Sequence, residues 1–122
     1  MTEGDGLPGH DSAVDAYSTA GLASRGLYAG LRSAIEPIGP YQEEVKKTCL
    51  HLTRKTAFMG VYFRKEHLIL SLKADHAVES PRVSKLEQLS KNRWHLQVKI
   101  DARADLDAQL LDWIRAAYDL CA

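Results

Sequence analysis

The sequence predicts an α+β fold, in which an open, mainly antiparallel sheet of about five strands packs one face against an N-terminal and a C-terminal helix. Three observations favour this class. Apolar residues recur at helical spacing near both ends of the chain, the residues between them alternate with the period of two that strands show, and the expected strands follow one another through short turns. Strands joined by short turns pair antiparallel, which leaves one face of the sheet for the two helices.

The length and composition are those of a single domain. The chain has 122 residues, of which 45% are apolar and 26% are charged, enough for one hydrophobic core and too few for two. We expect one domain from residue 22 to residue 122, preceded by a mobile tail over residues 1 to 21 that is rich in Gly, Asp and Ser. The acidic, polar start and the absence of a long apolar run predict a cytoplasmic protein with no membrane partner.

The first helix is expected from about Ala23 to Glu36, because apolar residues recur there at helical spacing and Pro37 ends the run. After the turn at Gly39-Pro40 the period shifts to two. Apolar and polar side chains then alternate, which predicts one continuous strand from about Val45 to Thr53.

Four further strands are expected: Ala57 to Phe63, His67 to Lys73, Val83 to Leu89, and Arg93 to Ile100. Polar turns at Arg64 to Glu66 and at Ser90 to Asn92 join them in two hairpins, with a loop over Asp75 to Pro81 between the hairpins. The last strand, RWHLQVKI, places Trp, Leu, Val and Ile on one side and Arg, His, Gln and Lys on the other. This alternation predicts one buried and one solvated face.

A C-terminal helix completes the predicted fold. Its apolar side is formed by Leu106, Leu110, Trp113, Ile114, Ala117 and Tyr118. Asp101, Asp105 and Asp107 crowd the start of this helix, where carboxylates suit the positive end of the helix dipole. We interpret these three residues as caps, not as ligands of a hard cation.

Four blocks of sequence carry a family resemblance: AIEPIGPYQEEVKKT, RKTAFMGVYFRKEHLILSL, SPRVSKLEQLSKNRWHLQVKI and DARADLDAQLLDWIRAAYDL. In this order and spacing they resemble the uncharacterised bacterial domain of unknown function 5655, over roughly Leu27 to Leu120. The shared features include the Gly-Pro turn, Arg54 and Phe58 at the start of the hairpin, His95 in the final strand, and the pattern from Asp105 to Tyr118.

This resemblance implies a small α+β domain that occurs alone or joined to other domains, some of them linked to nucleic-acid metabolism or defence. It implies no known activity. Relatives often carry a second histidine beside the one that corresponds to His95, whereas this sequence has Leu96. That departure weakens any acid-base or metal mechanism that needs a pair of adjacent histidines.

Charge is distributed unevenly along the chain although the formal net charge is zero. Residues 45 to 99 carry 12 basic and 4 acidic side chains, whereas residues 1 to 44 carry 2 and 7, and residues 100 to 122 carry 2 and 5. The strand-forming middle of the chain is therefore strongly basic. Such a segment suits an anionic partner, or is neutralised by the acidic ends of the same chain.

The predicted strands place many polar side chains on the face opposite the helices. These are Lys47, Cys49, His51, Thr53, His67, Ser71, Lys73, Arg93, His95, Gln97 and Lys99. The simplest interpretation is the solvated side of an open sheet, which must be polar and on which cations protect exposed strands. The alternative is a basic face that binds nucleic acid, a nucleotide or an acidic protein surface.

For that binding face the candidate anion-binding residues are Arg54, Lys55, Lys73, Arg93, His95 and Lys99. Phe58, Tyr62 or Trp94 would offer a ring on which a base could stack, as in sheet-based binders of single strands. A non-enzymatic binding or interaction module is the function that we favour from the sequence.

A small metal-dependent enzyme is the alternative from a different class. Cys49 and His51 lie two residues apart on one strand, and His95 is expected on the same face, so a thiolate and two imidazoles could hold zinc. No phosphate-binding Gly-rich loop, nucleophile elbow or HExxH motif supports catalysis. Cys49 and Cys121 are expected to be reduced, although a disulfide between them stays open.

An exposed aromatic ring is the last feature of the predicted sheet. Tyr62 and Phe63 are adjacent on a strand, so one of them must face away from the core. Together with Met59, that ring suggests a homodimer formed through the sheet.

Overall fold

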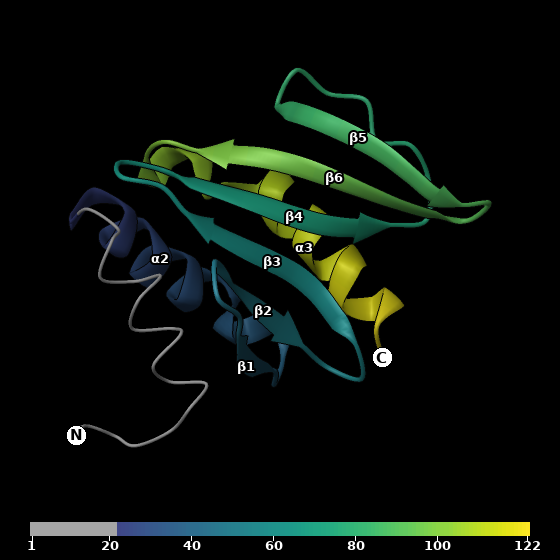
Figure 1. Cartoon of the computed structure of the whole chain (residues 1–122), viewed down its shortest axis with the longest axis horizontal. Coiled ribbons are helices and arrows are strands. Elements are labelled where there is room, and N and C mark those ends of the chain that lie inside the picture. The colour runs from purple at the N-terminus through teal and green to yellow at the C-terminus, as the bar shows by residue number, and fades with distance from the viewer. Residues whose placement is uncertain (1–21) are drawn as a thin grey trace.

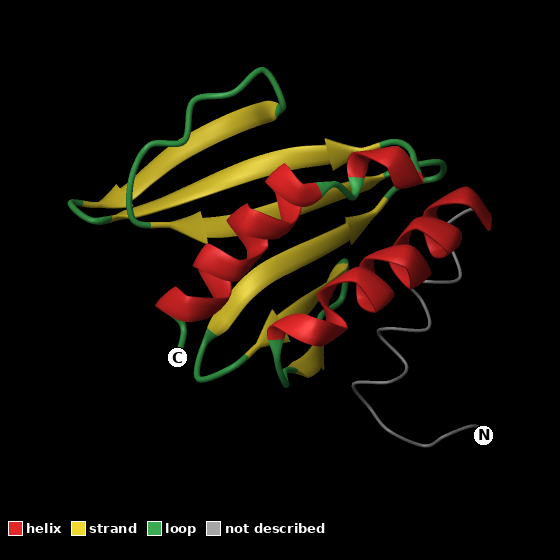
Figure 2. Ribbon diagram, turned by 180° about the vertical axis from the view of Figure 1, so that it is seen from behind, coloured by secondary structure: helices red, strands yellow, loops and turns green. Residues whose placement is uncertain are grey.

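The computed structural model describes residues 22 to 122, and the expected mobile tail lies outside this part of the chain. The α+β class is confirmed. The described residues form an open sheet of six strands, one more than expected, in the order β1-β2-β3-β4-β6-β5, and every neighbouring pair is antiparallel. Two α-helices lie on the same face of this sheet, as Figures 1 and 2 show from opposite sides.

The elements follow one another in the order α2 (Leu22–Ile35), the 3-10 helix η1 (Glu36–Ile38), β1 (Gln42–Val45), β2 (Cys49–Thr53), β3 (Ala57–Phe63), β4 (Leu68–Ala74), β5 (Val83–Ser90), β6 (Arg93–Ile100), the 3-10 helix η2 (Arg103–Asp105) and α3 (Ala108–Leu120). No helix among these residues is long and apolar enough to cross a membrane.

The predicted strand from Val45 to Thr53 is wrong, because two antiparallel strands occupy this region. β1 ends at Val45, the amide of Lys46 donates to the carbonyl of Cys49 across 2.9 Å, and the chain returns as β2. Val45 pairs with Leu50, so both apolar side chains face the helices. The turn, Lys46 to Thr48, contains none of the residues Gly, Pro, Asn and Asp that usually mark turns, and only its run of adjacent polar residues signals it.

The hydrophobic core lies between the sheet and the two helices. α2 contributes Leu27, Leu31 and Ile35. β4 contributes every second residue, as its alternating burial shows. The largest fully buried side chains are Phe58, Leu31, Ile35, Leu52, Met59, Leu68, Leu70, Leu72, Leu96, Ile100, Leu110 and Ile114.

The turn after the first helix is held by the last one. Gly39 has a φ of 147°, a conformation that L side chains rarely adopt, and a Cβ at this position would collide with the hydroxyl of Tyr118. That hydroxyl donates to the carbonyl of Pro40 across 2.6 Å, and the Tyr118 ring packs edge-on against Phe58 with centroids 5.2 Å apart. The Gly-Pro turn is therefore a packing feature of the fold.

Of the three aspartates predicted to cap the C-terminal helix, only Asp107 caps α3. Asp105 accepts from the amides of Asp101 and Ala102 before η2, and Asp101 pairs with Lys99. Asp107 is the N-cap, and its carboxylate accepts from the amide of Leu110 across 3.0 Å. Arg82, in the loop between β4 and β5, donates to the same carboxylate across 2.7 Å. These two contacts lower the pKa of Asp107 below its usual range, the amide hydrogen bond more than Arg82. The loop is thereby fastened to α3.

Candidate anion-binding site

No helix or strand of residues 22 to 122 covers the face of the sheet opposite the helices, and this face carries polar side chains in cross-strand rows. One row crosses all six strands of the described sheet, and its members are Glu44, His51, Gly60, Ser71, Gln97 and Lys85. A second row contains Lys73 on β4, His95 on β6 and Glu87 on β5. We call this surface, formed by the two rows and by Cys49, Tyr62, Ile69 and Lys99, the open face.

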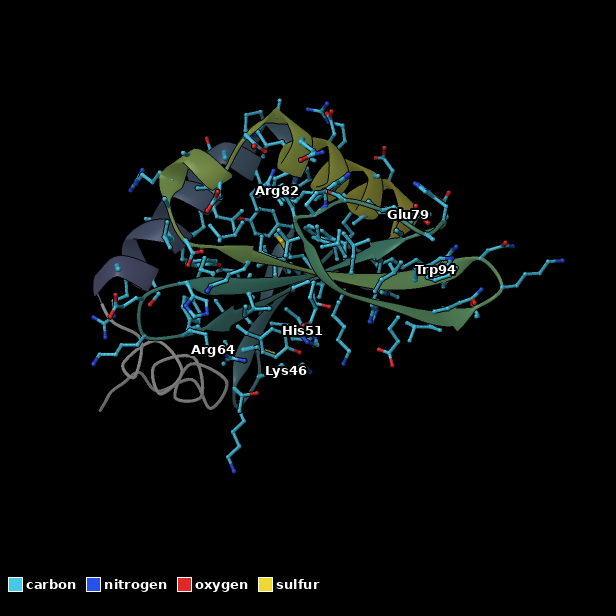
Figure 3. All side chains as sticks on the ribbon, turned by 90° about the horizontal axis from the view of Figure 1, so that it is seen from above. Lys46, His51, Arg64, Glu79, Arg82 and Trp94 are labelled. Carbon is cyan, nitrogen blue, oxygen red and sulfur yellow. The ribbon has the colours of Figure 1, made fainter. Side chains whose placement is uncertain are left out.

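A hollow of about 300 Å³ lies in the middle of the open face. Its lining residues are His51, Ala57, Phe58, Met59, Gly60, Tyr62, Ser71, Lys73 and His95. Gly60 and Ser71 are directly opposite each other on β3 and β4, and both are small, so the surrounding side chains rise above them. Figure 3 shows His51 on this side of the sheet, away from α3.

Space above Gly60 is available. A Cβ on this residue would lie 3.4 Å from Tyr62 Cε1 and 3.7 Å from both His51 Cδ2 and Ser71 Cβ, which are ordinary contact distances. An isolated glycine inside a strand often marks a close approach of another group to the backbone. Here the glycine opens the hollow and is not required by backbone conformation, because its φ is not positive.

Lys73 is the cation of the hollow. It is half-buried, and none of the described carboxylates lies within ion-pair distance of its ammonium. Its cross-strand neighbour is His95, whose pKa is lowered first by burial and second by the charge of Lys73, against an opposing effect of Glu87. At neutral pH the hollow therefore presents an ammonium beside an uncharged imidazole.

Cys49 and Tyr62 form the other border of the open face. They are cross-strand partners on β2 and β3. Burial raises the pKa of the Cys49 thiol, and the side chain is only 4% exposed. Burial also raises the pKa of Tyr62. Because thiolates are the reactive and metal-binding form of cysteine, Cys49 is a packed thiol here.

The structure does not assemble the zinc site that the sequence suggested. His51 on β2 and His95 on β6 are separated by three strand spacings, or roughly 14 Å at the backbone. Among residues 22 to 122 no group of three or more His, Cys, Asp and Glu side chains is placed to hold a metal ion. Cys49 and Cys121 are both free and buried, which corrects the open possibility of a disulfide.

The six predicted anion-binding residues are dispersed. Lys73 and His95 line the hollow, Lys99 lies on the open face and pairs with Asp101 at 3.6 Å, and Arg93 lies at the start of β6. Arg54 and Lys55 lie in the turn between β2 and β3, outside the hollow.

Arg54 has a structural partner. Its guanidinium lies 3.9 Å from the centre of the Tyr118 ring, and it donates to the Tyr118 carbonyl across 3.1 Å. The family resemblance at Arg54 and Phe58 is therefore explained by packing around Tyr118.

The predicted stacking rings are also placed differently. Phe58 is buried, and Trp94 packs against the core on the helix side, so among the described aromatic residues Tyr62 is the ring on the open face. The proposed dimer contact at Met59 is corrected in the same way, because Met59 is only 2% exposed.

Lys85 and Glu87 are open-face residues that the sequence reasoning missed. They lie on β5 opposite Gln97 and His95. Their alternation with Leu86 could have placed them, but Ser84 and Leu89 interrupt the period of two, where the structure has register shifts.

A second hollow of about 310 Å³ lies between α3 and the loop after β4. Its lining is mainly apolar and includes Trp113, Val78 and Leu120; Lys73 and His76 also border it, together with the carboxylates of Asp75 and Asp119. Two carboxylates oppose an anion, so this hollow does not compete for the role of the first.

Comparison with known families agrees with the resemblance seen in the sequence. The family described as Domain of unknown function (DUF5655) matches residues 13 to 121, and the chain belongs to this family. Searches of curated proteins and of solved structures found no match.

Proposed function

We propose that this protein is a binding module that holds a phosphate group of an anionic partner in the hollow of the open face. The observation that carries the proposal is the position of Lys73, a half-buried cation without a carboxylate partner in the described chain, on the wall of a hollow. A phosphate oxygen offers such an ammonium the charge-assisted hydrogen bond that residues 22 to 122 do not supply.

The neighbouring groups suit the same ligand. The hydroxyls of Ser71 and Tyr62 and the imidazoles of His51 and His95 line the hollow and can each donate a hydrogen bond to a phosphate oxygen. The volume of about 300 Å³ is at the lower end of the range for ligand pockets, so it suits one phosphate and the group attached to it.

The wider face favours an extended polyanion as the source of that phosphate. Lys85, Arg93 and Lys99 surround the hollow at distances of one or two strands. Cations spread over this face would attract a nucleic-acid backbone without reading its sequence, and Tyr62 would supply a ring for one base. A free nucleotide or phosphate ester would use the hollow alone.

The test compares these sources directly. Fluorescence anisotropy would measure binding of labelled single- and double-stranded DNA and RNA at low and at physiological salt, and calorimetry would measure binding of inorganic phosphate and of a nucleoside monophosphate. We expect oligonucleotide binding that weakens as salt increases. Binding of the small phosphates with no added gain from oligonucleotides would assign the site to a free ligand.

The decisive variant is Lys73→Ala, with Lys91→Ala as the matched control. Lys91 is an exposed lysine in the turn between β5 and β6, outside the hollow. A charge-assisted hydrogen bond contributes about 1.5–3 kcal/mol, so K73A should lose at least about tenfold in affinity, whereas K91A should lose only the small share of one distant charge. Equal losses in the two variants, or no binding of any probe at low salt, would reject the proposal.

A further inference from the structure

The outer strand β5 is an exposed edge of the sheet. Among the described strands it pairs only with β6, and seven of its eight residues are exposed. The exposed large hydrophobic residues of the described chain are Leu86 and Leu89, at 37% and 52%, and both lie on β5. Figure 3 looks onto this edge, with Glu79 and Arg82 of the preceding loop on the helix side of the sheet. Native edges are usually blocked by charge, by covering segments or by short length.

We propose that two copies of this chain pair antiparallel through their β5 strands, about a two-fold axis at Leu86. In this register Lys85 lies opposite the partner's Glu87, and Glu87 lies opposite the partner's Lys85. Leu86 then packs against its own copy on the helix side of the joined sheet, to which Leu86 belongs because it pairs with Leu96 of β6. The strand is thus complementary to itself in both charge and hydrophobicity.

The charge pattern selects this register among its neighbours. An axis at Lys85 would place two lysines opposite each other, and an axis at Glu87 would place two glutamates opposite each other. Like charges directly across a ladder are destabilising, whereas opposite charges are favourable. The segment from Lys85 to Gln88, between the two register shifts of β5, is regular and is centred close to Leu86.

The other edge of the sheet provides the contrast. β1 is only four residues long and carries Glu43 and Glu44 in succession. If two copies of β1 paired antiparallel about an axis at Glu43 or at Glu44, that glutamate would lie opposite its own copy. Glu43 is also engaged by Tyr28 of α2. The pattern at β5 is therefore specific to one edge of this sheet.

Pairing through β5 would place both open faces on the same side of one continuous sheet. The two β4 strands would then be five strand spacings apart, roughly 24 Å. If the proposed function holds, two phosphate-binding hollows would face one polyanion. The pairing itself does not depend on that function.

Sedimentation velocity of the full chain over a wide concentration range tests the pairing. The native protein should dimerise in a concentration-dependent manner. Lys85→Glu and Glu87→Lys should each weaken dimerisation by about tenfold or more, because each turns two attractive pairs into repulsive ones. An equimolar mixture of K85E and E87K should form heterodimers with near-native affinity, since both pairs are then opposite in charge.

Three results would overturn the pairing: a native protein that stays monomeric at the highest attainable concentration, a dimer that K85E leaves unchanged, or a mixture of K85E and E87K that does not associate. Because both side chains are exposed, a urea midpoint close to native in each variant checks that the fold is retained. Tyr62→Ser distinguishes pairing through β5 from a dimer formed through the open face. It should leave β5 pairing intact and weaken only a dimer of the second kind. K73A should likewise leave dimerisation unchanged, so failure of the phosphate site and failure of the edge are distinguishable.

Discussion

The covered and open faces of the sheet have different physical roles, and β4 shows both within one strand. Leu68, Leu70 and Leu72 face the helices and are at most 1% exposed. Ser71 and Lys73, between and beside them in the sequence, face the open side and are half-buried. The covered face is determined by the burial of apolar area, which leaves the open face free to vary. Stability and binding should therefore respond to different residues of the same strand.

The largest expected effect tests the covered face. Leu70→Ala should lower the free energy of unfolding by about 2–5 kcal/mol, because it removes a fully buried side chain from the centre of the core and leaves a cavity. Ile69→Ala, one residue away on the open face, is the matched control and should cost less than half as much. Urea unfolding of both variants measures the difference. Equal losses would show that the open face is also packed, against a second copy or another segment.

Arg54 tests whether a cation next to the sheet belongs to the binding surface or to the core. Arg54→Ala should lower the free energy of unfolding by about 1 kcal/mol, because the contact with the Tyr118 ring and one hydrogen bond to a backbone carbonyl are lost. Arg54→Lys should not restore this stability, since an ammonium cannot reproduce the planar stack. If Arg54→Ala kept full stability but lost phosphate binding, Arg54 would be an anion-binding residue after all.

The fold class and most element boundaries were predictable from the sequence, because periodicity reports burial. The strands at Ala57 to Phe63 and Arg93 to Ile100 were predicted with the boundaries that the structure shows. The turn between β1 and β2 was missed because it contains no Gly, Pro, Asn or Asp, so the alternation of Thr48, Leu50 and Leu52 with Lys47, Cys49 and His51 was extended back to Val45. The insertion of β6 between β4 and β5 was not predicted either, since strand order depends on tertiary packing and not on local pattern.

The candidate site was predictable only in part. Lys73 and His95 were placed on the correct face by alternation, whereas their direct pairing needed the strand order. Arg54 was predicted to bind an anion from its charge alone. Its contact with Tyr118 joins two residues that are 64 positions apart in the sequence, which a local pattern does not reveal. Gly60 was visible as an isolated glycine in a strand, and that signal could have predicted the hollow.

Gly60→Ala should change the two properties in opposite directions. The added methyl fits at ordinary contact distances, and alanine loses less backbone entropy on folding than glycine, so stability should rise by roughly 0.5 kcal/mol. The same methyl occupies the hollow and should reduce phosphate affinity. Thermal unfolding and calorimetry on one protein sample measure both. If affinity did not fall, the ligand would bind elsewhere on the open face.

The smallest effect, the titration of His95, reports the electrostatics of the hollow most directly. Its pKa in the folded protein should lie below the ordinary value near 6.5, because burial and the charge of Lys73 disfavour the imidazolium. The unfolded chain then binds more protons than the folded one in the interval between the two values. His95 therefore leaves the free energy of unfolding unchanged above about pH 6.5. As the pH falls from there towards the lower pKa of the folded protein, the free energy of unfolding decreases.

Two substitutions should shift the pKa of His95 in opposite directions. Lys73→Ala should raise the pKa of His95, since it removes a repelling charge, and Glu87→Gln should lower it, since it removes an attracting one. Titration of the imidazole by NMR measures all three proteins, and bound phosphate should raise the same pKa because an anion next to the ring favours its protonated form. A His95 pKa that did not respond to Lys73→Ala would show that the ammonium points away from the ring. The hollow would then lack the cation on which phosphate binding depends.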